Sequence, residues 1–142
     1  MNQMEYVHFT GFSQKTFEFF MKIGFENTPQ HFEALRGEFN EVVLAPLKQL
    51  SLSVSPTLAQ IDGAFDLRPV MGGTISRIRR DTRFSKNKAP YRTKMWLKFI
   101  TKEPGMRLAF YFDLDPSGCV FGLGTSHTTP QEMSEKRRYF LA

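Results

Sequence analysis

The stretch Lys94-Met95-Trp96-Leu97-Lys98-Phe99-Ile100 decides the fold, because here the apolar pattern changes from a helical period to a period of two. Such alternation places Met95, Leu97 and Phe99 on one face of a β-strand and the intervening residues on the other. Residues 107–114 alternate in the same manner and predict a second half-buried strand. Asp115-Pro116-Ser117-Gly118 has the residue order of a type I turn, so residues 119–124 predict a third strand of an antiparallel meander.

Three weaker expectations surround this meander. Thr74–Arg80 alternates poorly and is a candidate fourth strand. Pro104-Gly105 supplies the turn between the first two strands. Cys119 alternates with apolar residues of the third strand, which favours a buried and inert thiol.

The preceding half of the chain has the spacing of amphipathic helices. Ser13 as an N-cap and Gly24 as a terminator predict a helix over 14–23. Thr28-Pro29 begins another helical stripe that extends to about Val54. Because Pro46 lacks a backbone donor, we expect a kink or break near Val42, and hence two helices or one bent helix.

Two further signals complete the helical prediction. Ser55-Pro56 is expected to close the long stripe, with only a short helical turn at Leu58 and Ile61. After the meander, Thr129-Pro130-Gln131-Glu132 is a capping box with proline at the first helical position. The helix that follows places Met133, Arg137 and Phe140 near one face. Helices, then a meander, then a helix predict an α+β fold in one domain over residues 1–142.

The composition is that of an ordinary globular protein. The 142 residues are 41% hydrophobic and 23% charged, which excludes a disordered chain, a collagen-like repeat and a coiled coil. One cysteine and three scattered histidines give no disulfide framework and no metal-ligand spacing, so we expect no metal and no cofactor. No signal peptide or apolar run of about 20 residues is present, which favours a cytoplasmic protein without a membrane partner.

The net charge of +5 is concentrated in one part of the chain. Residues 67–102 hold eleven of the 19 Lys and Arg, and the one acidic residue among them is Asp81. Within them, four arginines fall between positions 77 and 83. Arginine forks bind phosphate or carboxylate through two hydrogen bonds, so an anionic ligand is expected here. The candidate ligand-binding residues are Arg77, Arg80, Asp81, Arg83, Ser85, Lys88 and Tyr91.

Strand geometry sharpens this expectation. Arg77 and Arg79 should share one face, while Ile78 anchors the other. The alternative is a solvated basic loop in which Asp81 pairs with one of the arginines.

This basic run resembles the signature of a bacterial and fungal family called domain of unknown function 2461. The family's Arg-Asp-x-Arg-Phe-Ser-Lys-Asp-Lys-x-Pro-Tyr core is similar to residues 80–91 here, and Phe9-x-Gly11-Phe12, Pro46-Leu47, Tyr111-Phe112 and Gly122-x-Gly124 also resemble it. The resemblance implies the same helical half and meander, a site at the basic run, and no established activity.

The chain also departs from that family pattern. Asn87 stands where the family has an acidic residue, and Pro29 and His31 replace the Arg and Trp of its Asn-Arg-Glu-Trp-Phe motif. If those side chains line the family's site, the site is altered here. Relatives usually continue beyond this length, so a missing C-terminal part is one interpretation. Apolar surface would then be exposed, and an exposed C-terminal helix could support an oligomer.

Three functions remain open at this stage, and no catalytic residue is identified. Binding of a phosphorylated or carboxylated small molecule ranks first. Nucleic-acid binding is second, because Phe84, Tyr91, Trp96 and Phe99 are interleaved with the basic residues. A non-catalytic protein-interaction module is third. Asp113 and Asp115 could bind Mg²⁺, but the turn beginning at Asp115 favours a structural role.

Overall fold

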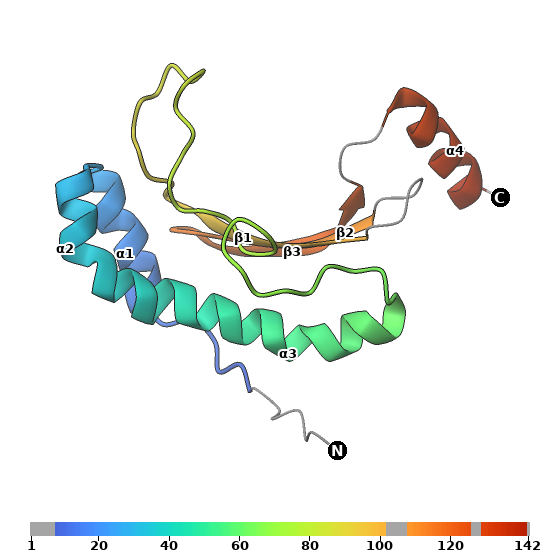
Figure 1. Ribbon diagram of the computed structural model, residues 1–142, viewed down its shortest axis with the longest axis horizontal. Coiled ribbons are helices and arrows are strands. Elements are labelled where there is room, and N and C mark those ends of the chain that lie inside the picture. The colour runs from blue at the N-terminus through green and yellow to red at the C-terminus, as the bar shows by residue number, and fades with distance from the viewer. Residues whose placement is uncertain (1–7, 102–107, 126–128, 142) are drawn as a thin grey trace.

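The computed structural model describes residues 8–101, 108–125 and 129–141. Helices followed by a three-stranded antiparallel sheet and a further helix make an α+β fold, as the sequence predicts. Figure 1 shows α3 beneath the sheet and α1 and α2 at one end of it. The elements are α1 (Gln14–Phe25), α2 (Pro29–Phe39), the π-helix η1 (Asn40–Leu44), α3 (Ala45–Ile61), β1 (Met95–Ile100), β2 (Leu108–Asp115), β3 (Gly118–Thr125) and α4 (Pro130–Leu141).

The sheet has the order β1-β2-β3, and its apolar face lies toward α3. Along this face Leu97 of β1 pairs with Phe112 of β2, which pairs with Phe121 of β3. The core joins this face to the helices and is rich in phenylalanine. Its buried phenylalanines are Phe19, Phe20, Phe32, Phe39, Phe65 and Phe99.

The predicted turn between β2 and β3 is confirmed. The Asp115 Oδ1 accepts a hydrogen bond from the Ser117 backbone N–H at 2.7 Å, and Gly118 has a φ of +138°. The bonds from Ser117 hold the pKa of the Asp115 carboxyl below its ordinary value. This carboxylate therefore shapes the turn.

The break expected near Val42 is also confirmed, and it takes the form of a π-helix. Pro46 has no N–H to offer the carbonyl of Val42, four residues earlier. That buried carbonyl instead accepts a hydrogen bond from Thr16 Oγ1 at 2.7 Å. The side chain of α1 thus satisfies the group that proline leaves open.

Both helix ends predicted from glycine and proline were placed too early. α1 continues through Gly24, because the Glu26 N–H still bonds the Lys22 carbonyl at 3.2 Å. α3 continues through Pro56 to Ile61. The carbonyl that Pro56 leaves open belongs to exposed Leu52, so water can satisfy it and the helix need not end.

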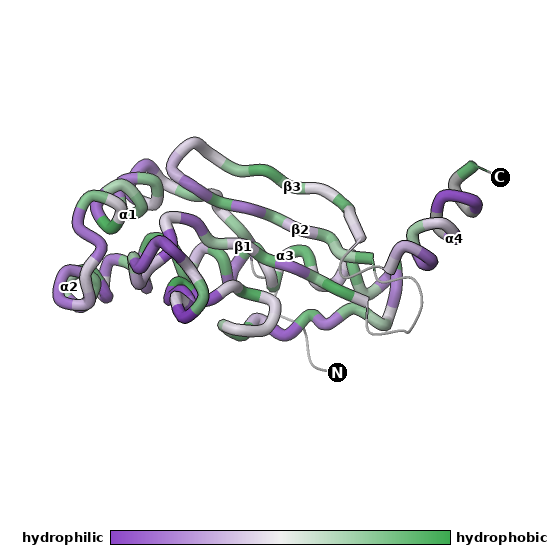
Figure 2. Tube along the Cα trace, turned by 90° about the horizontal axis from the view of Figure 1, so that it is seen from above, coloured by the Kyte–Doolittle hydropathy of each residue, from purple (hydrophilic) through white to green (hydrophobic). Residues whose placement is uncertain are grey.

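Two expectations about the sheet were wrong. Residues 74–80 make only the isolated bridges Met71↔Ile75, Ile75↔Leu97 and Arg79↔Tyr91 and are not a fourth strand. Cys119 is exposed. Its strand lies at the edge of the sheet, as Figure 2 shows, and α3 leaves that side of the apolar face uncovered, so that Phe121 is also 80% exposed.

The capping box of α4 is confirmed. The Thr129 N–H donates to Glu132 Oε2 at 2.8 Å, and the Glu132 N–H donates to Thr129 Oγ1 at 3.2 Å. α4 stands apart from the strands (Figures 1 and 2), and Leu141 at its end is exposed. The predicted turn at 104–105 and the side chain of Phe140 lie outside the described residues. No helix in the described ranges is long and apolar enough to cross a membrane.

Candidate functional site

Residues 77–92 form a hairpin that rises from the sheet on the side opposite α3 (Figure 1). The Arg92 N–H bonds the Ile78 carbonyl at 2.8 Å, and the Arg80 N–H bonds the Pro90 carbonyl at 2.7 Å. These two bonds pair the arms of the hairpin where it leaves the body of the protein. We call residues 77–79 and 91–92 the hairpin base, and residues 80–90 the hairpin tip.

The hairpin base is anchored in the core. Ile78 and Tyr91 are buried, and the Tyr91 ring stacks on Phe32 with their centroids 4.3 Å apart. The Asn27 side chain accepts a hydrogen bond from the Tyr91 N–H and donates one to the Tyr91 carbonyl, both at 2.9 Å. The alternation predicted from the sequence is confirmed, because Arg77 and Arg79 are exposed on either side of buried Ile78.

The hairpin tip is held by its own polar side chains. The half-buried Arg80 guanidinium donates to the Ala89 carbonyl and to Ser85 Oγ, both at 3.2 Å. Lys88 Nζ donates to the Thr82 carbonyl at 2.8 Å. Arg80, Ser85 and Lys88 were predicted as ligand-binding residues, and each of them forms a bond that stabilises the loop.

The two remaining candidates in the hairpin tip pair with each other. Arg83 Nη2 lies 2.7 Å from Asp81 Oδ2, and the Arg83 guanidinium also lies 5.7 Å from the ring centroid of exposed Phe84. The bonds from Arg83 hold the pKa of the Asp81 carboxyl below its ordinary value, and the pKa of Arg83 is raised in turn. This pair matches the alternative interpretation, in which Asp81 neutralises one arginine of a solvated loop.

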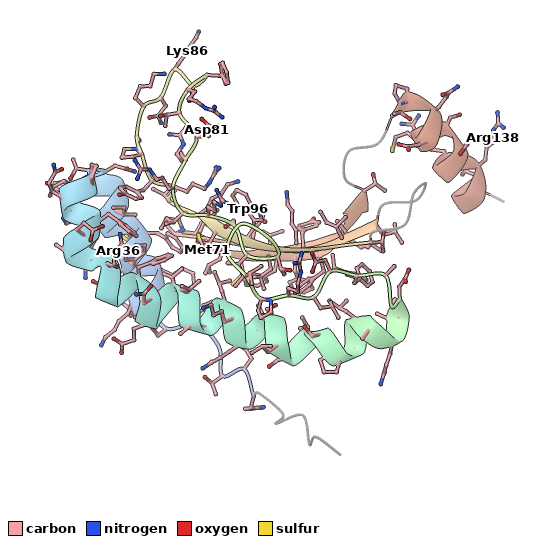
Figure 3. All side chains as sticks on the ribbon, viewed as in Figure 1. Arg36, Met71, Asp81, Lys86, Trp96 and Arg138 are labelled. Atoms are coloured by element: carbon pink, nitrogen blue, oxygen red, sulfur yellow. The ribbon has the colours of Figure 1, made fainter. Side chains whose placement is uncertain are left out.

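Two cations of the hairpin base differ from the bonded cations of the tip, whereas the third, Arg92, donates from its Nε to the Arg77 carbonyl at 3.2 Å. The guanidinium groups of Arg77 and Arg79 make no hydrogen bond or ion pair with any residue that the structure describes. Together with Arg92 they line an open cleft of about 500 Å³. The Arg92 guanidinium lies 4.9 Å from the ring centroid of Trp96, and Figure 3 shows Trp96 on the sheet face opposite α3. We call this hollow the basic cleft.

A glycine pair forms one wall of the basic cleft. Gly72 has a φ of +87°, which L side chains rarely adopt. A Cβ at Gly72 would also lie 2.6 Å from Arg77 Nε, so the arginine lies directly against this backbone. Glycine at position 72 is therefore needed both for the turn and for the approach of Arg77.

Of the seven ligand-binding residues predicted from the sequence, the basic cleft is lined by Arg77, Arg80 and Asp81. The seven predicted residues do not include Arg79, Arg92, Trp96 or the glycine wall, which also line the cleft. The sequence placed Arg79 on the same face as Arg77 and named Trp96 as an aromatic residue for nucleic-acid binding, but neither entered the list of seven. Arg92 and Trp96 join the cleft only because the hairpin closes, and residue types alone gave no signal for that pairing.

Three further hollows lie in the described part of the structure, and one of them, of about 370 Å³, has Arg80, Arg92 and Lys94 among its lining residues. A cavity of about 280 Å³ lies between the hairpin base and the helices α2 and η1. Arg77 and Arg79 line both this cavity and the basic cleft. A larger hollow of about 540 Å³ lies between α3 and the strands β2 and β3. Its walls are apolar, and it lacks the converging polar groups that orient a small molecule.

The residues that the structure describes contain no cluster of three or more His, Cys, Asp or Glu side chains able to hold a metal ion.

Residues 15–141 match a family described as a conserved hypothetical protein (DUF2461). The chain belongs to the DUF2461 family. The matched range contains the whole hairpin and all three strands. The chain matches no curated protein and no solved structure.

Proposed function

We propose that this DUF2461 protein binds a phosphorylated or carboxylated small molecule in the basic cleft at the hairpin base. The observation that carries the proposal is the pair Arg77 and Arg79, two exposed guanidinium groups without a described partner, beside Arg92 on one cleft. Guanidinium forks match the oxygens of phosphate and carboxylate and bind them by charge-assisted hydrogen bonds. Arg80, Arg83 and Lys88 of the tip are less available, because they already donate within the loop.

The anchoring of the hairpin base supports binding in a second way. A ligand is bound more tightly when the groups that contact it are already held in place. The stacked Tyr91 ring and the two bonds to Asn27 fix the backbone from which Arg92 extends. Gly72 fixes the position of Arg77 from the opposite wall. Only the arginine side chains themselves lose freedom when the anion binds.

The test is a titration of the protein with inorganic phosphate, pyrophosphate and citrate by isothermal calorimetry. A hydrogen bond to a charged group contributes about 1.5–3 kcal/mol, so Arg77→Ala and Arg79→Ala should each weaken binding by about 10-fold or more. The matched control is Lys88→Ala, whose ammonium group donates to the Thr82 carbonyl of the tip and does not line the basic cleft. It should bind as the parent does. The proposal fails if the parent binds none of the three anions, or if Lys88→Ala loses as much affinity as Arg77→Ala.

Nucleic-acid binding is a second candidate, and a specific arrangement favours it. Three cations surround the ring of Trp96, with Arg92, Lys94 and Lys98 between 4.9 and 5.6 Å from its centroid. A basic surface around an aromatic ring suits a single strand, on which bases stack and phosphates pair. Fluorescence anisotropy with a labelled 12-nucleotide single strand, measured over a range of salt concentrations, tests it. Binding should fall steeply with salt, and Lys98→Ala should flatten that slope. A parent protein that leaves the anisotropy unchanged at low salt would remove this candidate.

A further inference from the structure

We infer that the anion recognised in the basic cleft is joined directly to an aromatic or similarly small apolar ring, which binds in the 280 Å³ cavity between the hairpin base and the helices α2 and η1. This inference rests on the proposed function, because the same two arginines hold the anionic group. It adds the chemical class of the ligand, namely an aryl phosphate or an aryl carboxylate.

The cavity has apolar walls and a polar rim. Phe32, Phe39, Ile78 and Tyr91 line it from the core, and the partly exposed Met71 closes it from the segment before the hairpin. Methionine adapts its shape to rings and makes favourable contacts with them. Figure 3 shows Met71 at the hairpin base and Arg36 on α2.

The size of the cavity limits what it can hold. A closed apolar cavity of about 150 Å³ is large enough to bind benzene. The volume here is about 280 Å³, so one ring fits. Most small-molecule sites combine such apolar walls with a few polar groups that fix the orientation of the ligand.

The shared arginines fix how the ring and the anion are connected. Arg77 and Arg79 line both this cavity and the basic cleft, so an anion bound by them lies where the two hollows meet. A ring attached to that anion by one bond or through one atom would contact the apolar walls of the 280 Å³ cavity directly. A ligand with a long polar linker would leave the cavity unused.

The π-helix places a further polar group at this cavity. η1 begins at Asn40, an exposed residue that lines the cavity and whose side-chain amide makes no hydrogen bond to the described residues. A π-helix inside an α-helical run is found frequently at functional sites. The π-helix arises at Pro46. The Asn40 amide that it places at the cavity has an NH₂ donor group and a carbonyl acceptor, which are available to a substituent of the ring.

The experiment compares methyl phosphate with phenyl phosphate, because the two ligands share the phosphate monoester and differ only in the ring. Phenyl phosphate should bind at least about 10-fold more tightly, a difference of about 1.4 kcal/mol. Met71→Trp should fill the cavity and abolish the preference while methyl phosphate still binds. Met71→Leu, a substitution of similar volume, should keep the preference. Asn40→Phe blocks the cavity from the opposite side and provides a second test if Met71→Trp disturbs its own turn.

The outcomes separate this inference from the proposed function. If both phosphates bind equally to the parent, or if the preference survives both blocking variants, the ring cavity is wrong and the anion site stands. If neither phosphate binds to the parent, the inference fails, and the proposed function fails with it when inorganic phosphate, pyrophosphate and citrate do not bind either. A preference that Met71→Trp and Asn40→Phe each remove, and that Met71→Leu retains, is the result that supports the inference.

Discussion

The hairpin base and the hairpin tip both contain several basic residues, but the base is packed against the core and the tip extends into solvent (Figure 1). The tip contains Arg80, Arg83, Lys86 and Lys88, and all of these cations except Lys86 donate to a carbonyl, a hydroxyl or a carboxylate of the tip itself. In the base Arg92 donates to the Arg77 carbonyl, whereas the described residues provide no such partner for the guanidinium groups of Arg77 and Arg79. The backbone of the base is bound to the core, whereas the tip extends away from it (Figure 1).

The difference shows that the number of charges in a segment does not identify its ligand-binding residues. A guanidinium that already donates to the loop must lose those bonds before it can bind an anion. An exposed and unpaired guanidinium on a fixed backbone has no such cost. The predictions below test this contrast between base and tip, from the largest expected effect to the smallest.

The largest effect, on the free energy of unfolding, is expected from the Tyr91 ring at the hairpin base. Tyr91→Ala removes a buried aromatic side chain that stacks on Phe32, and should lower the free energy of unfolding by about 3–5 kcal/mol. Phe84→Ala is the matched change in the tip, where the ring is 94% exposed, and should alter it by less than about 0.5 kcal/mol. Urea unfolding of the two variants measures both values. Equal losses would show that the tip is packed as tightly as the base.

The next effect combines stability with binding. Gly72→Ala forces a non-glycine residue into a φ of +87° and places a methyl group against Arg77. It should cost about 1–3 kcal/mol of stability and weaken phosphate binding as Arg77→Ala does. Gly37→Ala on α2 meets no neighbouring atom and should stabilise the helix by about 1 kcal/mol. Calorimetric titration and thermal unfolding of both variants test this pair, and unchanged affinity in Gly72→Ala would contradict the role of the glycine wall.

A smaller effect distinguishes two adjacent arginines. Arg80→Ala loses its bonds to Ala89 and Ser85, so the free energy of unfolding should fall by about 1 kcal/mol and hydrogen exchange at the Ser85 amide should quicken. Arg79→Ala should leave both quantities unchanged and weaken anion binding instead. Exchange mass spectrometry and calorimetry on the two variants show whether stability and binding separate in this way. Similar behaviour in both assays would remove the distinction between base and tip.

The smallest effect is electrostatic and lies at the tip. Because Arg83 lowers the pKa of Asp81, the folded carboxyl should titrate below the ordinary aspartate range in a carbon-detected NMR titration. The stabilisation from this pair is present above the unfolded pKa and is lost as the pH falls through the folded pKa. In Arg83→Ala the midpoint should move up toward the ordinary value. A midpoint that does not move would show that Arg83 is not the cause of the shift.

The sequence predicted most of the fold, because its signals are local. The alternation in β1 and β2, the proline that leads to the π-helix and the capping box of α4 each depend on neighbouring residues. The prediction failed where tertiary context decides. Cys119 belongs to a regular strand, but the strand lies at the uncovered edge of the sheet. Pro56 suggested a helix end, but α3 continues because the carbonyl that the proline leaves open belongs to the exposed residue Leu52.

The site was predictable as a segment but not as a set of side chains. The resemblance to DUF2461 and the arginine density both pointed to residues 77–92, and the family assignment is confirmed. Which cations face the cleft depends on the closure of the hairpin, on Asn27 sixty-four positions before Tyr91, and on Gly72 against Arg77. These are contacts between segments that no local pattern specifies.

The most direct test of the central claim observes each arginine separately. In ¹H–¹⁵N NMR spectra of the arginine Nε groups, titration with phosphate should shift the signals of Arg77 and Arg79 most. The signal of Arg92 should shift less, because its Nε already donates to the Arg77 carbonyl. The signals of Arg80 and Arg83 should stay in place, because their guanidinium groups remain bonded within the hairpin tip. Shifts confined to Arg80 and Arg83, or equal shifts at all five arginines, would contradict the account.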